Sequence, residues 1–282
     1  MPHVINMALL KRHFTVMTLR YQTNSAHFDF PEIREFPAIR YVIASSPRCG
    51  SNLLQRALWR SGLAGAPEEY LTDAYPKDFA MRWDISDGAG GVNAEQYLRI
   101  LMRFRTSPNS VFGLKVHGSH LSNSFLKRLD LGQQLEQPIY ILIRRRNKFL
   151  QAVSYLLARQ TGVWILDGAW LPDKEAVTST PTYSLPELLA CLEGIIQEES
   201  EWDRYFADRH ITPYTVIYEE LVANYETVTA KVLSHLGIYD FQGHITEPGI
   251  KRQATTQNAE WAERFERDLK SAHDLYILTS AK

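Results

Sequence analysis

The 282-residue chain carries 31 lysines and arginines against 32 aspartates and glutamates, and 45% of its residues are hydrophobic. This is the composition of a globular protein, and it excludes a disordered or fibrous chain. The near balance of charge excludes a global positive field of the kind that drives nonspecific nucleic-acid binding. We therefore expect no nucleic-acid partner, and any anionic ligand must be bound by a local cluster of cations.

The N-terminal 36 residues are interpreted as a peripheral arm, and residues 37–282 as one folded domain. A short apolar run at residues 4–10 is followed by Lys11 and Arg12, which places positive charge on the wrong side for a secretory signal. No segment reaches the roughly 18 to 20 apolar residues that a membrane span requires.

The cysteines, Cys49 and Cys191, lie in different settings and offer neither a disulfide framework nor metal-ligand spacing. Together with the missing secretory signal, this cysteine usage predicts a cytoplasmic protein without a transmembrane segment or a metal site.

Short apolar runs alternate with amphipathic segments along the chain. In chain order the pattern predicts a strand at 40–44, helices at 52–60 and 94–103, strands at 111–116 and 138–143, helices at 147–160 and 185–206, a strand at 213–218, and helices at 219–236 and 259–269. The strands are continuously apolar, as expected for strands buried on both faces. Strands that alternate with helices predict an α/β fold of three layers, with a central parallel sheet flanked by helices.

The first candidate site follows the strand at 40–44, where a turn of small residues leads into a helix. Backbone N–H groups and the positive end of the helix dipole converge in such a turn and bind anions. Compared with the nucleotide-binding pattern G-x-x-x-x-G-K-[ST], the chain reads Ser45-x-x-x-x-Gly50-Ser51-Asn52, with Arg48 inside the loop. The lysine for a γ-phosphate and the hydroxyl for magnesium are both missing at their usual places. The loop therefore suits a phosphosulfate held by cations and amides without a divalent metal, the alternative being a plain strand-to-helix turn.

The second candidate site is the run Arg144-Arg-Arg146, which directly follows the strand at 138–143. These cations emerge at the carboxyl edge of the sheet, where open α/β folds bind ligands. Arginine presents a fork that matches a phosphate better than lysine does. Alone, such a run is more often a solvated corner, but its pairing with the first loop favours a phosphate site.

At these residues the sequence resembles the sulfotransferases that use 3'-phosphoadenosine 5'-phosphosulfate (PAPS). The resemblance is closest to their bacterial carbohydrate branch, typified by the trehalose and nodulation-factor sulfotransferases, and covers roughly residues 40–270. It implies a P-loop-like fold, a PAPS co-substrate and no metal. The residues that it implies for the 5'-phosphosulfate are Arg48, Cys49, Gly50, Ser51 and Asn52. Cys49 departs from the serine of close relatives, and a thiol is a poor hydrogen-bond donor.

Three further segments match the same family. The resemblance implies that Arg145 and Ser154 bind the 3'-phosphate, and the segment Gln151-Ala-Val-Ser154 matches the trehalose enzymes well. A C-terminal loop containing Lys251, Arg252 and Gln253 resembles the family's loop that closes over the nucleotide. The segment Tyr218-Glu-Glu-Leu221 resembles another recurring family segment.

The resemblance leaves the general base open. The stretch from Gly62 to Tyr70 resembles one in which a glutamate before an aromatic residue is the base, which implies Glu69, while Glu68 is expected to be exposed. Lys115-Val-His117 resembles the Lys-x-His of eukaryotic cytosolic sulfotransferases, which implies that Lys115 steadies the sulfuryl group and His117 takes the acceptor proton. A structural alternative for His117 is a strand-end histidine bonded to neighbouring carbonyls.

These observations predict a sulfotransferase that moves a sulfuryl group from PAPS to a hydroxyl of a carbohydrate or glycolipid by in-line transfer. The resemblance also implies a homodimer. The catalytic residues would be Glu69 or His117, with Lys115 and Arg48 stabilising charge. Flat aromatic side chains that could pack on a sugar ring are Tyr70, Trp83 and Trp164. Two alternatives remain: a P-loop nucleotide kinase or NTPase, against which the missing Gly-Lys-Ser/Thr triplet counts, and a non-catalytic glycan- or nucleotide-binding protein of the same fold.

Overall fold

The computed structural model of the chain describes residues 26–72, 76, 79, 82–85, 91–122, 126, 129–164, 180–247 and 255–280. Its sheet consists of β1 (Ile39–Ser45), β2 (Val111–His117), β3 (Ile139–Arg144) and β4 (Tyr214–Ile217). The helices are η1 (Ala26–Phe28), α2 (Ser51–Arg60), α4 (Ala94–Arg105), η2 (Gly118–Ser122), α5 (Leu131–Gln134), α6 (Lys148–Thr161), α7 (Leu185–Asp208), α8 (Tyr218–Ala223), α9 (Tyr225–His235) and α10 (Thr256–Ser280).

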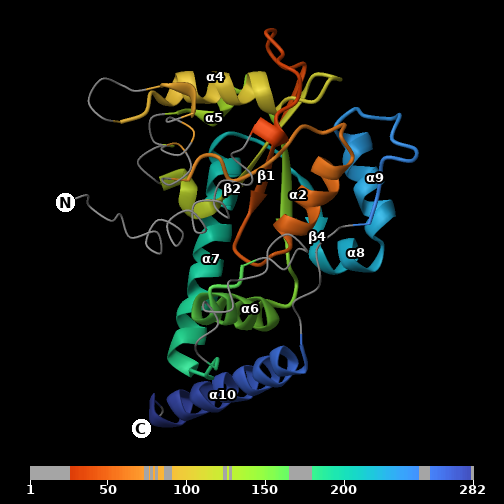
Figure 1. The fold of residues 1–282 in the computed structure, drawn as a ribbon. Coiled ribbons are helices and arrows are strands. Elements are labelled where there is room, and N and C mark those ends of the chain that lie inside the picture. The colour runs from red at the N-terminus through yellow and green to blue at the C-terminus, as the bar shows by residue number, and fades with distance from the viewer. Residues whose placement is uncertain are drawn as a thin grey trace, which may run out of the picture.

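All described strands are parallel and lie in the order β2-β1-β3-β4. Alternate residues of each strand point to opposite faces. Val42 and Leu114 pack toward α4 and the second half of α7, whereas Ile43 and Ile141 pack toward α2, α8 and α9. Figure 1 shows the sheet between these two groups of helices, with α6 below it and α10 beneath α6. The predicted three-layer α/β fold, with a P-loop-like strand, turn and helix at its start, is confirmed.

Each predicted strand is present to within about a residue at either end, but two predicted helices differ from the structure. The helix predicted at 259–269 is longer and forms α10, Thr256–Ser280. The segment 219–236 forms two helices, α8 and α9, which meet at Asn224. The backbone of Asn224 has φ −136° and ψ 53°, which lies outside the helical region, and asparagine is a poor helix former. The chain therefore turns at Asn224, and Leu221 of α8 and Val232 of α9 both pack into the same core.

The described part of the predicted arm, residues 26–36, lies against α4. The backbone N–H groups of Phe30 and Ile33 donate to the carbonyl oxygens of Phe104 and Arg103, both at 2.9 Å. Among the residues whose structure is described, no helix is long and apolar enough to cross a membrane.

The order of the strands in the sheet indicates where a ligand can bind. The chain passes from β1 to β2 on one side of β1, and then to β3 on the other side. Open α/β sheets bind ligands outside the carboxyl ends of the strands at such a reversal. The loop after β1 and the residues after β3 therefore meet at one crevice, and these are the two segments that the sequence singles out.

Candidate active site

The turn after β1 has the backbone of an anion cradle. Gly50 precedes α2 with φ 94°, and no side chain caps the first turn of this helix. A Cβ atom at Gly50 would lie 2.2 Å from the ring of Tyr218, so only glycine fits. Arg48 also adopts a left-handed φ of 61°, which is uncommon for a residue with a side chain. A helix start without a capping side chain is a typical anion-binding site.

The backbone N–H of Cys49 donates to the Ser46 carbonyl oxygen at 3.4 Å within this turn. The side chain of Cys49 is fully buried in the core between the sheet and α2, and this burial raises the pKa of the thiol. The exchange of serine for cysteine thus falls at a position where the side chain packs among apolar neighbours. Ser51 and Asn52 begin α2, and Ser51 is also buried.

Arg48 contacts Ser154 on α6, and Arg145 lies beside Arg48. The Nε of Arg48 donates to Ser154 Oγ at 3.0 Å. The guanidinium of Arg145 donates to the Arg48 carbonyl oxygen at 3.4 Å and lies 4.7 Å from the ring centroid of Tyr218. Burial and the nearby charge of Arg145 lower the pKa of Arg48 to about 10. Arg48 with the Ser154 hydroxyl, and the neighbouring guanidinium of Arg145, form a donor set that suits a phosphate.

The backbone that carries Arg145 is held by a carboxylate, Glu219, for which the sequence predicted no role. Glu219 accepts the backbone N–H groups of Arg146 at 3.0 Å and Asn147 at 3.1 Å. Burial raises the pKa of Glu219, but these bonds outweigh it and the pKa is lowered. The segment that begins at Tyr218 therefore packs against the loop glycine and fixes the turn after β3. The resemblance of residues 218–221 to a family segment was the sequence signal that could have identified Glu219.

A second cluster gathers around Lys115 on β2, whose side chain is only 2% exposed. Its ammonium group lies 2.8 Å from Glu69 Oε1 and 3.9 Å from Glu68 Oε1, and it also donates to the side-chain oxygen of Asn52. Asn52 belongs to the first turn of α2. Lys115 thus connects the anion cradle with the two glutamates.

His117, at the end of β2, lies between Glu69 and β1. Its Nε2 is 3.3 Å from Glu69 Oε1, and its Nδ1 is 2.8 Å from Ser45 Oγ. Burial raises the pKa of Glu69, but the charge of Lys115 and the hydrogen bonds from His117 and Lys115 outweigh it and hold this pKa well below its usual value. An ionised carboxylate can only accept, so we assign a proton to Nε2. In a neutral His117 the remaining lone pair on Nδ1 then faces the Ser45 hydroxyl.

The expectation that Glu68 is exposed is wrong. Glu68 is 8% exposed, because its carboxylate accepts from Gln55 Nε2 at 2.8 Å and from the backbone N–H of Glu69 at 2.9 Å. A buried carboxylate needs such partners. Glu68 therefore shapes the turn that presents Glu69, whose own side chain is 26% exposed.

The three aromatic candidates for sugar packing differ in exposure. Tyr70 is fully buried and donates to the Ala66 carbonyl, so its expected role in sugar packing is wrong. Trp83 packs among other aromatic rings, Phe79 and Phe104 among them. Trp164 is 42% exposed, and its carbonyl accepts from Arg48. Only Trp164 combines an exposed ring with a contact to the crevice. Lys251, Arg252 and Gln253 lie outside the described residues.

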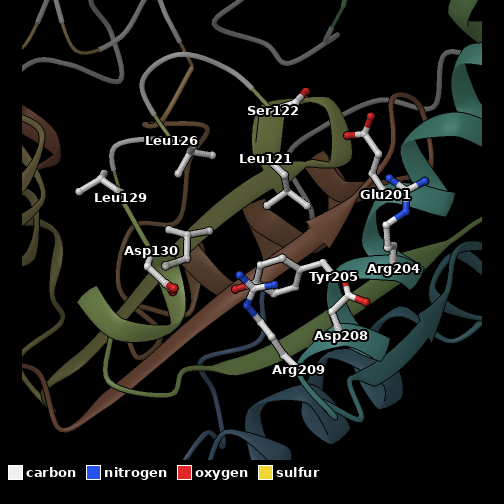
Figure 2. A pocket seen from close by; sticks show the side chains of 11 residues that line it. Leu121, Ser122, Leu126, Leu129, Asp130, Glu201, Arg204, Tyr205, Asp208 and Arg209 are labelled. Carbon is white, nitrogen blue, oxygen red and sulfur yellow. The ribbon is translucent and has the colours of Figure 1, made fainter.

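A separate pocket of about 450 Å³ lies between α7 and the segment that follows β2 (Figure 2). Its lining residues are Leu121, Ser122, Leu126, Leu129, Asp130, Leu131, Glu201, Arg204, Tyr205, Asp208 and Arg209. The guanidinium of Arg209 lies 4.1 Å from the ring centroid of Tyr205. None of the predicted site residues lines this pocket, so we place the active site at the crevice instead.

The chain is similar in sequence to known proteins. The chain is 26% identical to trehalose 2-sulfotransferase of Mycolicibacterium smegmatis, over 81% of this chain and 94% of that protein. It is 25% identical to trehalose 2-sulfotransferase of Mycobacterium tuberculosis, over 80% and 93% of the two chains. The sulfotransferase domain of the Synechococcus PCC 7002 olefin synthase aligns at 16% identity and a TM-score of 0.42, over 83% of this chain and 98% of that chain. Residues 40–268 match the Stf0 sulphotransferase family, and the chain therefore belongs to this family.

Proposed function

We propose that this sulfotransferase uses PAPS as its donor and a hydroxyl of a carbohydrate or glycolipid as its acceptor. The family membership supports sulfuryl transfer, and the trehalose 2-sulfotransferases among its relatives support a sugar acceptor. The donor set fits PAPS, because the crevice combines uncapped helix amides with Arg48, Arg145 and Ser154. The loop amides and Arg48 can hold the 5'-phosphosulfate, while Arg145 and Ser154 hold the 3'-phosphate.

The observation that carries the proposal is the position of Lys115. Its ammonium group contacts Asn52 at the anion cradle and Glu69 at the same time. A sulfuryl group in the cradle would therefore lie next to a cation and a carboxylate. Transfer of such a group depends mainly on positioning and on stabilisation of charge on its oxygens.

We assign these residues the following roles. The loop amides and Arg48 bind the phosphosulfate, and Lys115 stabilises the charge that develops on the transferred group. Glu69 accepts the proton of the acceptor hydroxyl. Arg145 and Ser154 bind the 3'-phosphate, and Lys251, Arg252 and Gln253, which lie outside the described residues, also bind the nucleotide. The catalytic domain is residues 37–282.

Glu69 is the better candidate for the base than His117. The lone pair of a neutral His117 faces Ser45, 2.8 Å away, and its Nε2 faces the Glu69 carboxylate. His117 therefore orients Glu69 and helps to keep it ionised. The carboxylate of Glu69 accepts from Lys115 and His117 through Oε1, which leaves Oε2 for an acceptor hydroxyl.

The proposal is tested by incubating the protein with PAPS and a panel of trehalose, other disaccharides and glycolipids. Mass spectrometry should find a sulfated sugar in an amount equal to the 3'-phosphoadenosine 5'-phosphate (PAP) released. Binding of PAP without turnover on any acceptor would favour the non-catalytic alternative. Tighter binding of ATP with magnesium than of PAPS would favour a nucleotide kinase.

A further inference from the structure

The residues that lead into the anion cradle are bound by a buried glutamine from another element. Gln151 lies on α6 and is fully buried. Its Nε2 donates to Ser46 Oγ at 3.0 Å and to the Pro47 carbonyl oxygen at 2.8 Å. Ser46 and Pro47 directly precede Arg48. The side-chain amide therefore fixes the backbone at the point where it enters the cradle.

The same contacts extend to α7. The hydroxyl of Ser46 donates to Glu199 Oε1 at 3.3 Å, and Lys148 forms an ion pair with Glu199. Lys148 also lies 3.5 Å from Gln151 Oε1. Both hydrogens of the Gln151 amide and its oxygen thus have partners, and a fully satisfied buried network of this kind is rigid.

Gln151 and Ser154 lie three residues apart on α6, so they are on the same side of one rigid helix. Gln151 holds the loop that would bind the 5'-group, and Ser154 would contact the 3'-phosphate. We infer that Gln151 is a positioning residue that fixes the phosphosulfate loop relative to Ser154. This inference rests on the proposed function of the crevice.

The variant Gln151→Met keeps the length of the side chain and removes its hydrogen-bonding groups. Loss of a buried partner costs about 1–3 kcal/mol, equivalent to a five- to 150-fold change in an equilibrium constant. We expect weaker binding of PAP and AMP by about tenfold or more, because both use the loop. Adenosine 3'-monophosphate, which would use Arg145 and Ser154, should change by less than about twofold.

The matched control is Gln160→Met on the same helix. Gln160 bonds to the Thr182 carbonyl and to Glu187, both at 3.0 Å and away from the loop. Calorimetry with the three nucleotides should find this variant unchanged. Equal losses for all three nucleotides in Gln151→Met, or no loss for any, would overturn the inference.

A second measurement needs no nucleotide. Hydrogen exchange of the amides at residues 48–52 should be faster in unliganded Gln151→Met than in the wild type and in Gln160→Met. Should Gln151→Met fail to fold, Ser46→Ala removes one partner of the amide and should give the same pattern with a smaller change. Unchanged exchange in the folded variant would refute the positioning role. If exchange is faster in Gln151→Met but the wild type does not bind PAP, the proposed function is refuted, whereas the positioning of the loop by Gln151 is not.

Discussion

Replacement of Glu69 by glutamine tests the proposed base directly. Glutamine has the size of glutamate, but it cannot accept a proton at neutral pH. Its side-chain oxygen can still accept from Lys115, which lies 2.8 Å from Glu69 Oε1, and Glu68 remains 3.9 Å from the same ammonium group. Lys115 therefore keeps part of its charge compensation, and we expect a loss of at most about 3 kcal/mol in stability. A positioned general base contributes about 10² to 10⁴ in rate, so turnover should fall at least a hundredfold.

The assay measures PAP release at saturating PAPS and acceptor, together with the affinity for PAP. We expect Glu69→Gln to bind PAP nearly as well as the wild type, because Glu69 does not belong to the nucleotide-binding groups. Glu68→Gln is a matched control, since it makes the same chemical change one residue away, and it should lose less turnover. His117→Asn should also lose less. If Glu69→Gln retains near wild-type turnover while His117→Asn is inactive, the base is His117 and the reasoning fails.

Four further outcomes are expected. Arg145→Ala should weaken the binding of PAPS by about ten- to hundredfold and the binding of adenosine 5'-phosphosulfate far less. Equal losses of affinity would show that Arg145 does not contact the 3'-phosphate. PAP binding measured by calorimetry should be the same with and without EDTA, and a signal lost on chelation would contradict the assigned donor set. Gly118→Ala should lower both the melting temperature and turnover, because a Cβ there would lie 2.1 Å from the Glu198 carbonyl oxygen and displace the neighbouring His117; an unchanged melting temperature would contradict this close packing. Because the pKa of Glu69 is lowered in the folded protein, its charge stabilises the fold above the unfolded pKa of about 4.3. This stabilisation is lost as the pH falls through the lower pKa of the folded state. The difference in unfolding free energy between wild type and Glu69→Gln should therefore shrink from pH 5 to pH 3, and a constant difference in denaturant titrations would refute it.

The sequence was sufficient for the succession of the strands and the longer helices along the chain, because continuous apolar runs and amphipathic periods are local signals. The short helices η1, η2 and α5 were not predicted. The sequence also indicated that the loop containing Arg48 and the turn containing Arg145 lie at the carboxyl edge of one sheet. Both predictions depend on chain direction alone, since the carboxyl ends of parallel strands share an edge. The break at Asn224 was missed because a single poor helix former does not interrupt the pattern on either side of it.

The tertiary structure decided which polar groups meet. Glu68 and Glu69 are adjacent in sequence, yet the first is buried against Gln55 while the second faces Lys115 and His117. The partners of buried polar side chains come from elements far apart in the chain, as Gln151 and Ser46 do across 105 positions. No local pattern encodes such a pairing, because it depends on how the layers pack. The sequence alone therefore determined the kind of site and its edge of the sheet, whereas packing determined the partners and the orientation of each group within it.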